Sequence, residues 1–154
     1  MKTRGLLLLF ILVGQLGCSS DEPRIDSFPD DPTIETLNGT WRVISFEDFE
    51  IGKSEERTQE NSWGKDIIIT FDDTVQPQRL SGKNTTNAIE GEFTYLGERQ
   101  FRVTHLISTY VGQPQWADKF LEAVGGGEVS FRVTADQLRI YYETGTKSVT
   151  LAKD

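Results

Sequence analysis

The sequence predicts an α+β fold that is mostly β: a single antiparallel, partly open β-barrel or curved sheet of about eight strands, with one helix covering the gap. Three observations lead to this prediction. Apolar and polar residues alternate with a period of two through most of residues 36–154. Gly and Asp residues typical of turns separate these segments. A helical period of 3.6 occurs only near residues 114–124.

Five strands are expected before the helix. The second is rich in β-branched residues and ends at the turn signal Asp72-Asp73. The alternation in the fifth places His105 on the same strand face as Phe101 and Val103. Gly97 suits the hairpin turn between the fourth and fifth strands. The five strands are expected at residues 41–46, 67–71, 78–83, 89–96 and 100–107.

The helix and three further strands complete the predicted barrel. Trp116, Phe120 and Val124 are four residues apart and share one helix face. Pro114 fits the first helical position, and Gly125 follows the last apolar residue, as is common at helix ends. The three later strands are expected around Phe131, Ile140 and Val149. The helix would then cover the gap in the barrel.

Residues 1–17 are typical of an export signal. Lys2 and Arg4 precede an apolar run at residues 6–13, which is too short to span a bilayer as a helix. Gly17 then precedes Cys18, the only cysteine of the chain, and this pattern resembles a bacterial lipobox. The resemblance implies cleavage before Cys18 and lipidation of its thiol. An ordinary secretory signal followed by a stray cysteine is the alternative.

Residues 18–35 are predicted to be an acidic, Pro-rich tether, followed by one folded domain at 36–154. Within 19–32 there are three prolines and five acidic residues, so we expect this segment to stay extended and unpacked. Ser20-Asp21-Glu22 is similar to the acidic export signal of Bacteroidota lipoproteins, which implies the outer face of the outer membrane. A solvated linker explains the same residues equally well.

Composition excludes several classes of function. The chain carries 24 acidic and 16 basic residues, for a formal net charge of -8, which argues against nucleic-acid binding. One cysteine rules out an internal disulfide and any Cys-based zinc site. One histidine argues against a classical metalloenzyme, which usually has several His ligands. We therefore expect no cofactor and no metal. An acidic body also needs the acyl chains for membrane attachment, because it lacks a basic surface.

Several segments resemble one known family. Residues 37–43, with the sequence Leu-Asn-Gly-Thr-Trp-Arg-Val, are similar to the Leu-x-Gly-Thr-Trp opening of META domains, found in HslJ-like bacterial lipoproteins. The family often has cysteines where this chain has Lys83 and residues 110–112. The resemblance implies a lipid-anchored envelope protein that is related to envelope stress and has no catalytic residues. The other matching segments are 69–71, 80–82 with Asn84 and Asn87, 91–95, 107–109 and 138–140.

The residues themselves offer few candidates for chemistry. His105 could act as a general base or a ligand inside the barrel, but a core or barrel-end histidine satisfied by a backbone group explains it better, since no nucleophile or second metal ligand accompanies it. Adjacent carboxylates such as Asp72-Asp73 are typical of solvated turns. Trp63 is the best contact candidate, because it lies in a polar loop at residues 51–65. The aromatic residues proposed to contact a ligand or partner are Trp63, Tyr110 and Tyr141.

The sequence therefore predicts a non-catalytic, lipid-anchored envelope protein with one META-like domain. It is expected in the bacterial outer membrane, periplasmic or surface-exposed, and attached through the lipid on Cys18. Its expected partners are envelope proteins. The alternative is a lipocalin-like carrier that holds a small apolar ligand inside the barrel. An enzyme is the third and least supported hypothesis.

Overall fold

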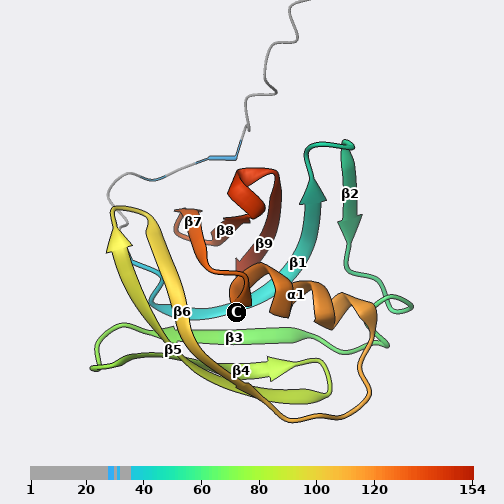
Figure 1. Ribbon diagram of the computed structural model, residues 1–154. Helices are drawn as coiled ribbons and strands as arrows, with labels where there is room; N and C mark the ends of the chain where they lie inside the picture. The colour runs from blue at the N-terminus through green and yellow to red at the C-terminus, as the bar shows by residue number, and fades with distance from the viewer. Residues whose placement is uncertain (1–27, 30, 32–35) are drawn as a thin grey trace, which may run out of the picture.

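The structure is a computed structural model that describes residues 28, 29, 31 and 36–154. The described chain contains nine β-strands, the helix α1 (Gln115–Gly125) and a short 3₁₀ turn, η1 (Glu143–Gly145), as Figure 1 shows. It is mostly β, as predicted. The strands are β1 (Gly39–Asp48), β2 (Lys53–Glu56), β3 (Ile67–Asp72), β4 (Gln78–Asn84), β5 (Asn87–Gly97), β6 (Gln100–Ser108), β7 (Glu128–Val133), β8 (Gln137–Tyr142) and β9 (Lys147–Lys153).

Eight of the strands form a closed antiparallel barrel. From β3 to β9, each strand pairs with the next one along the chain, and β1 pairs with both β3 and β9 to close the ring. The pairing of β1 with β9 runs from Trp41 to Asp48, with one irregularity between Val43 and Ser45. On its other edge, β1 pairs first with β3 and then with β2. The barrel of eight strands is therefore confirmed, and β2 is an additional strand.

The helix α1 covers the part of the barrel that the strands leave open. Strand β6 pairs with β7 only at Gln100–Arg102, so the described strands leave most of that edge of β6 unpaired. Helix α1 contacts β6, β8 and β9 there and buries one face, as its spacing predicts. The Trp116 ring meets the edge of Phe46 at a centroid distance of 4.7 Å. Pro114 is the N-cap of the helix rather than its first helical residue.

Aromatic side chains fill the barrel interior. Phe71, Phe93 and Phe101 pack in edge-to-face pairs with ring centroids 5.5–6.0 Å apart, and Phe131 extends the cluster. Such pairs add about 0.5–1.5 kcal/mol each to the gain from burying the rings. All four rings are at most 1% exposed. The interior is a packed core, and the grooves found on the described part of the chain open to solvent.

Two expectations about the organisation of the chain are wrong. Strand β2 lies inside the segment expected to be a loop, so the helix follows the sixth strand rather than the fifth. The sequence of β2, Lys-Ser-Glu-Glu, has no apolar alternation because the strand lies at an edge and its side chains are largely exposed. The tether is also not unpacked throughout, because Phe28 is only 7% exposed.

Gly82 tests how closely the strands are packed. A Cβ atom at Gly82 would lie 2.1 Å from the backbone oxygen of Ile68 on the paired strand β3. Because neither backbone can move without breaking the pairing, we expect Gly82→Ala to lower the free energy of unfolding by about 2–3 kcal/mol. Urea denaturation measures this change. Gly97→Ala is the control, since its Cβ meets nothing within 4 Å; equal losses in both variants would contradict the packing argument.

Candidate functional site

Three connections meet at the end of the barrel where α1 begins, at the right of Figure 1. Thr85, in the turn between β4 and β5, donates its backbone N–H to the oxygen of Asp66, 3.2 Å away. The Thr86 hydroxyl donates to the oxygen of Gly112 at 3.0 Å. The turn thus joins the two longer connections on either side of it. We call this region the loop end; it consists of residues 57–66, 84–87 and 109–114.

Asn87 holds the connection between β6 and α1. Its side chain is 2% exposed and makes four hydrogen bonds. The amide nitrogen donates to the Val111 oxygen at 2.9 Å and to Gln113 Oε1 at 2.6 Å. The amide oxygen accepts from the Val111 N–H at 2.8 Å and from the Thr109 hydroxyl at 3.0 Å. Tyr110 lies in the middle of this fixed segment, and its side chain is fully exposed.

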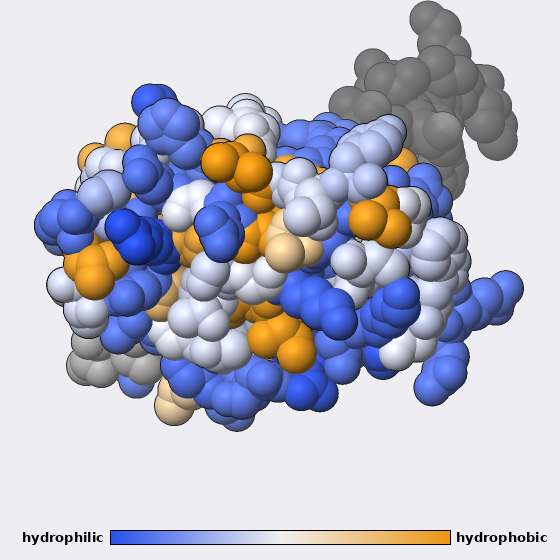
Figure 2. Space-filling view, turned by 90° about the horizontal axis from the view of Figure 1, so that it is seen from below, coloured by the Kyte–Doolittle hydropathy of each residue, from blue (hydrophilic) through white to orange (hydrophobic). Residues whose placement is uncertain are grey.

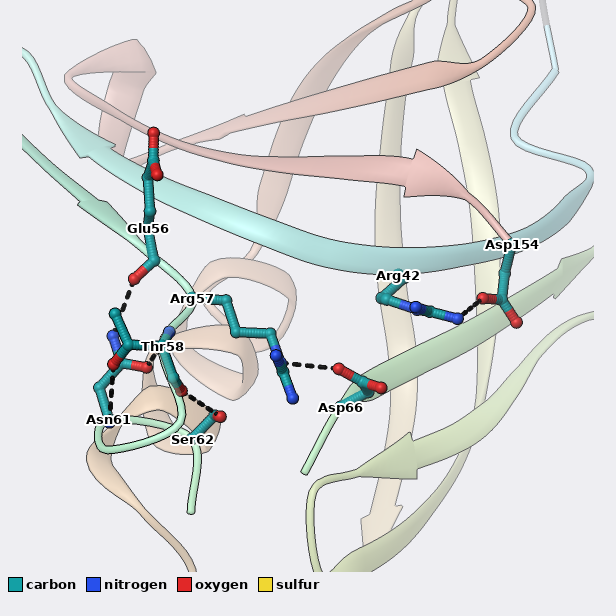
Figure 3. A network of polar contacts seen from close by, with 8 residues as sticks. All are labelled: Arg42, Glu56, Arg57, Thr58, Asn61, Ser62, Asp66 and Asp154. Atoms are coloured by element: carbon teal, nitrogen blue, oxygen red, sulfur yellow. Dashed lines mark hydrogen bonds and ion pairs between the residues drawn. The ribbon is translucent and has the colours of Figure 1, made fainter. Parts of the chain in front are cut away.

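A second hydrogen-bonded segment, residues 57–66, carries Trp63, and Figure 3 shows polar contacts of this segment. Arg57 and Asp66 form an ion pair of 2.7 Å across the base of the connection between β2 and β3. The backbone N–H of Thr58 donates to Asn61 Oδ1 at 2.8 Å, and the N–H of Asn61 donates to the Thr58 hydroxyl at 3.1 Å. Trp63 follows with a φ of +53° and is 56% exposed. That conformation costs about 1–2 kcal/mol for a residue with a Cβ.

The exposed apolar residues of the loop end are few: Trp63, Tyr110 and Val111. Val111, beside Tyr110, is 59% exposed. Figure 2 looks onto the face at the bottom of Figure 1, where hydrophobic residues form separate orange patches among hydrophilic ones. A few large aromatic side chains set among polar residues are typical of protein-binding surfaces.

The structure separates Tyr141 from the other two contact candidates. Trp63 and Tyr110 both belong to the loop end, whereas Tyr141 lies on the outer face of β8. The Tyr141 ring stacks on Phe49, with centroids 6.5 Å apart, and the Arg132 guanidinium lies 5.7 Å from it. Tyr141 is therefore half-buried in a cluster on the barrel wall. Cys18 lies outside the described residues.

The expected position of His105 is wrong. Phe93 pairs with Val103, but the adjacent Glu92 pairs with His105, so β6 carries one extra residue at Thr104. This bulge reverses which side chains point inward from that position on. His105 is consequently on the outer face, with its side chain 75% exposed and Nδ1 3.3 Å from Glu92 Oε2. It is neither a core histidine nor a base inside the barrel.

A charged groove lies beside the hairpin of β1 and β2. It measures about 180 Å³ and runs between β1, β2, α1 and the last two strands. Lys119 forms an ion pair with Glu55 there, and Lys147 pairs with Glu143 at 2.8 Å. Burial, together with nearby Glu122, raises the pKa of Tyr142 to about 12, so its hydroxyl stays protonated at neutral pH. The two lysines Lys119 and Lys147 of this groove are thus already held in ion pairs.

Among residues 28, 29, 31 and 36–154, no three or more His, Cys, Asp or Glu residues gather where they could hold a metal ion. No helix in the same part of the chain combines the length and apolar character needed to cross a membrane.

The rigidity of the loop end depends on Asn87. We expect Asn87→Ala to lower the free energy of unfolding by about 2–3 kcal/mol, because it removes four hydrogen bonds, two of which hold the backbone N–H and oxygen of Val111. Chemical denaturation measures this loss, and amide hydrogen exchange should show faster exchange at Val111. Asn38→Ala is the matched control, since Asn38 is exposed. If both variants lose the same stability, Asn87 does not fix the loop.

Comparison with known proteins places the fold. No protein-family model and no curated protein matches the chain. An NMR structure of a protein from Burkholderia xenovorans is similar over 82% of this chain and 99% of its own, with a TM-score of 0.59 and 15% identity. The crystal structure of a DUF4847 family protein from Bacteroides vulgatus is similar over 76% of this chain and 93% of its own, with a TM-score of 0.54 and 16% identity. The chain shares its barrel fold with both proteins.

Proposed function

We propose that this chain is a non-catalytic, lipid-anchored protein of the cell envelope that binds a partner protein through its loop end. The observation that carries the proposal is the exposure of Trp63 and Tyr110 on connections that networks of hydrogen bonds hold in place. Trp and Tyr are the residues most often found at the energetic centre of protein interfaces. Segments that are already ordered lose less conformational entropy on binding.

The filled barrel interior favours binding at the surface over the transport of a ligand. A lipocalin-like carrier needs an enclosed apolar cavity that is large enough for its ligand. In the described barrel, Phe71, Phe93, Phe101 and Phe131 occupy that space. The packed core also supports a role without catalysis, because the functional groups that remain accessible are surface residues such as His105.

The proposed anchor rests on the N-terminal sequence. Gly17-Cys18 follows a short apolar run, and the acidic residues after Cys18 resemble the export signal of surface lipoproteins. These features support a position at the bacterial outer membrane, periplasmic or surface-exposed. The META-like motifs support the same setting and a role related to envelope stress. Gly82 and Asn87, two residues of those motifs, have structural roles that explain why a related barrel would need them.

The anchor predicts a simple labelling result. Cells that are fed an alkyne-labelled fatty acid should incorporate it into the wild-type protein, while the Cys18→Ala variant should show no label above background. Acylation of the thiol requires Cys18 itself, since the chain has no other cysteine. Ser19→Ala is the matched control and should be labelled normally. Retention of the label in Cys18→Ala would overturn the anchor.

Binding at the loop end is tested by photo-cross-linking in cells. A photoreactive benzoylphenylalanine in place of Tyr110 should give a discrete protein adduct, because that side chain is fully exposed and replacing it disturbs no packing. The control places the same group at Leu96, which is 42% exposed at the opposite end of β5. Adding Trp63→Ala should reduce the adduct from position 110 by about tenfold, which is typical of losing one central aromatic anchor.

Two results would contradict this proposal. Equal adducts from positions 110 and 96 would show that contacts with neighbouring proteins are not specific to the loop end. An adduct that keeps its full yield when Trp63→Ala is present would show that the two exposed aromatic residues do not form one binding surface.

A further inference from the structure

A short segment before the barrel docks on the outer face of β7 and β8. Phe28 is 7% exposed, and the central guanidinium carbon of Arg139 lies 4.6 Å from its ring centroid. Three residues further on, the backbone N–H of Asp31 donates to the Val133 oxygen at 3.0 Å. Arg99 donates from Nη2 to the Asp31 oxygen at 2.8 Å. One aromatic contact and two hydrogen bonds thus hold Phe28 and Asp31 against the barrel, although the composition of their segment predicts that it is unpacked.

The surface beneath Phe28 is preformed. The guanidinium of Arg139 donates to both carboxylate oxygens of Glu47, at 3.0 and 3.2 Å, and Nε donates to the Thr150 hydroxyl at 3.0 Å. The Arg139 side chain is only 12% exposed. These bonds span β8, β9 and β1 and fix the plane of the guanidinium. A fixed guanidinium plane binds an aromatic ring with little loss of side-chain entropy.

The charges of the surface and of the segment are complementary. Arg132 and Arg139 are direct partners across β7 and β8, and both point outward. Like charges directly opposite on a sheet repel, so negative charge close by stabilises the pair. Glu47 supplies part of that charge. The residues from 19 to 32 hold five acidic side chains, and the backbone of one of them, Asp31, is bound at this face.

We propose that the outer face of β7 and β8 is a binding site for the chain's own acidic segment around Phe28 and Asp31, which straps the barrel close to its lipid anchor. The part that concerns the anchor rests on the proposed lipidation of Cys18. Ten Cα–Cα steps separate Cys18 from Phe28 and span at most about 35 Å. Release of the strap up to residue 36 would extend that reach to about 60 Å.

The test is amide hydrogen exchange, followed by mass spectrometry, on the full-length processed protein in detergent. The Asp31 amide should exchange slowly in the wild type because it is bonded to Val133. Phe28→Ala should speed that exchange by about tenfold or more, while Phe28→Tyr should keep it slow. Amides of the barrel core, such as that of Leu151, should not change in either variant, which shows that the barrel remains folded.

Two arginine variants locate the binding site. Arg139→Gln should speed exchange at Asp31 as much as Phe28→Ala does, because the ring loses its cationic partner. Arg42→Gln is the matched control: Arg42 is also an ion-paired arginine on the barrel wall, but its partner is Asp154 (Figure 3). It should leave the exchange at Asp31 unchanged.

Separate results would overturn the proposed strap and the proposed lipid anchor. If Asp31 exchanges at the same rate in the wild type and in Phe28→Ala, or responds equally to Arg42→Gln and Arg139→Gln, the strap is overturned whatever the lipidation result. If Cys18→Ala keeps its acyl label while exchange behaves as expected, the docking of the segment stands and the conclusion about reach from the membrane is overturned.

Discussion

The structure depends on the pairing of β1 with β9, which joins the first barrel strand to the last. This pairing closes the ring and covers the two strand edges, one of β1 and one of β9, that an open sheet would expose. The irregularity between Val43 and Ser45 allows β1 to bend, and its opposite edge then passes from β3 to β2. Because β2 and β3 occupy successive parts of one edge, the chain between them must leave the wall. That excursion is residues 57–66, which present Trp63 at the loop end.

A barrel with a filled interior concentrates specificity at its surface and its ends. The phenylalanine cluster makes the wall rigid, and the wall fixes the position of the turn between β4 and β5. From that turn, Asn84 donates to the Ala117 oxygen at 3.0 Å, and Asn87 binds the preceding connection. The start of α1 and the loop end are thereby ordered by the same two side chains. The helix that covers the opening and the surface proposed to bind a partner are parts of one hydrogen-bonded unit.

Local sequence patterns predicted the elements that bury one apolar face, namely the barrel strands and the helix. Alternation located the eight barrel strands, and spacing located α1, because each buries one apolar face. Alternation failed at His105, since one extra residue in β6 reverses the faces without changing the composition. Strand β2 was missed because its sequence is polar; its pairing with β1 through the backbone leaves no apolar pattern. Trp63 and Tyr110 were identified singly as contact candidates, and that role stays a prediction. Both residues lie at the loop end because strands far apart in the sequence pair with one another, and no local sequence pattern predicts that pairing.

The strap and the loop end lie on parts of the barrel that do not compete. Strand β6 pairs with β7 only at its first residues, whereas its last residues lead into the connection that carries Tyr110. The face of β7 and β8 that holds Phe28 is therefore remote from the loop end along β6. In the proposed lipid-anchored protein, a chain strapped on that face would keep one side of the barrel near the bilayer and leave the loop end accessible. Shortening the effective tether also restricts the volume that the barrel explores, which raises its effective concentration toward a partner in the same membrane.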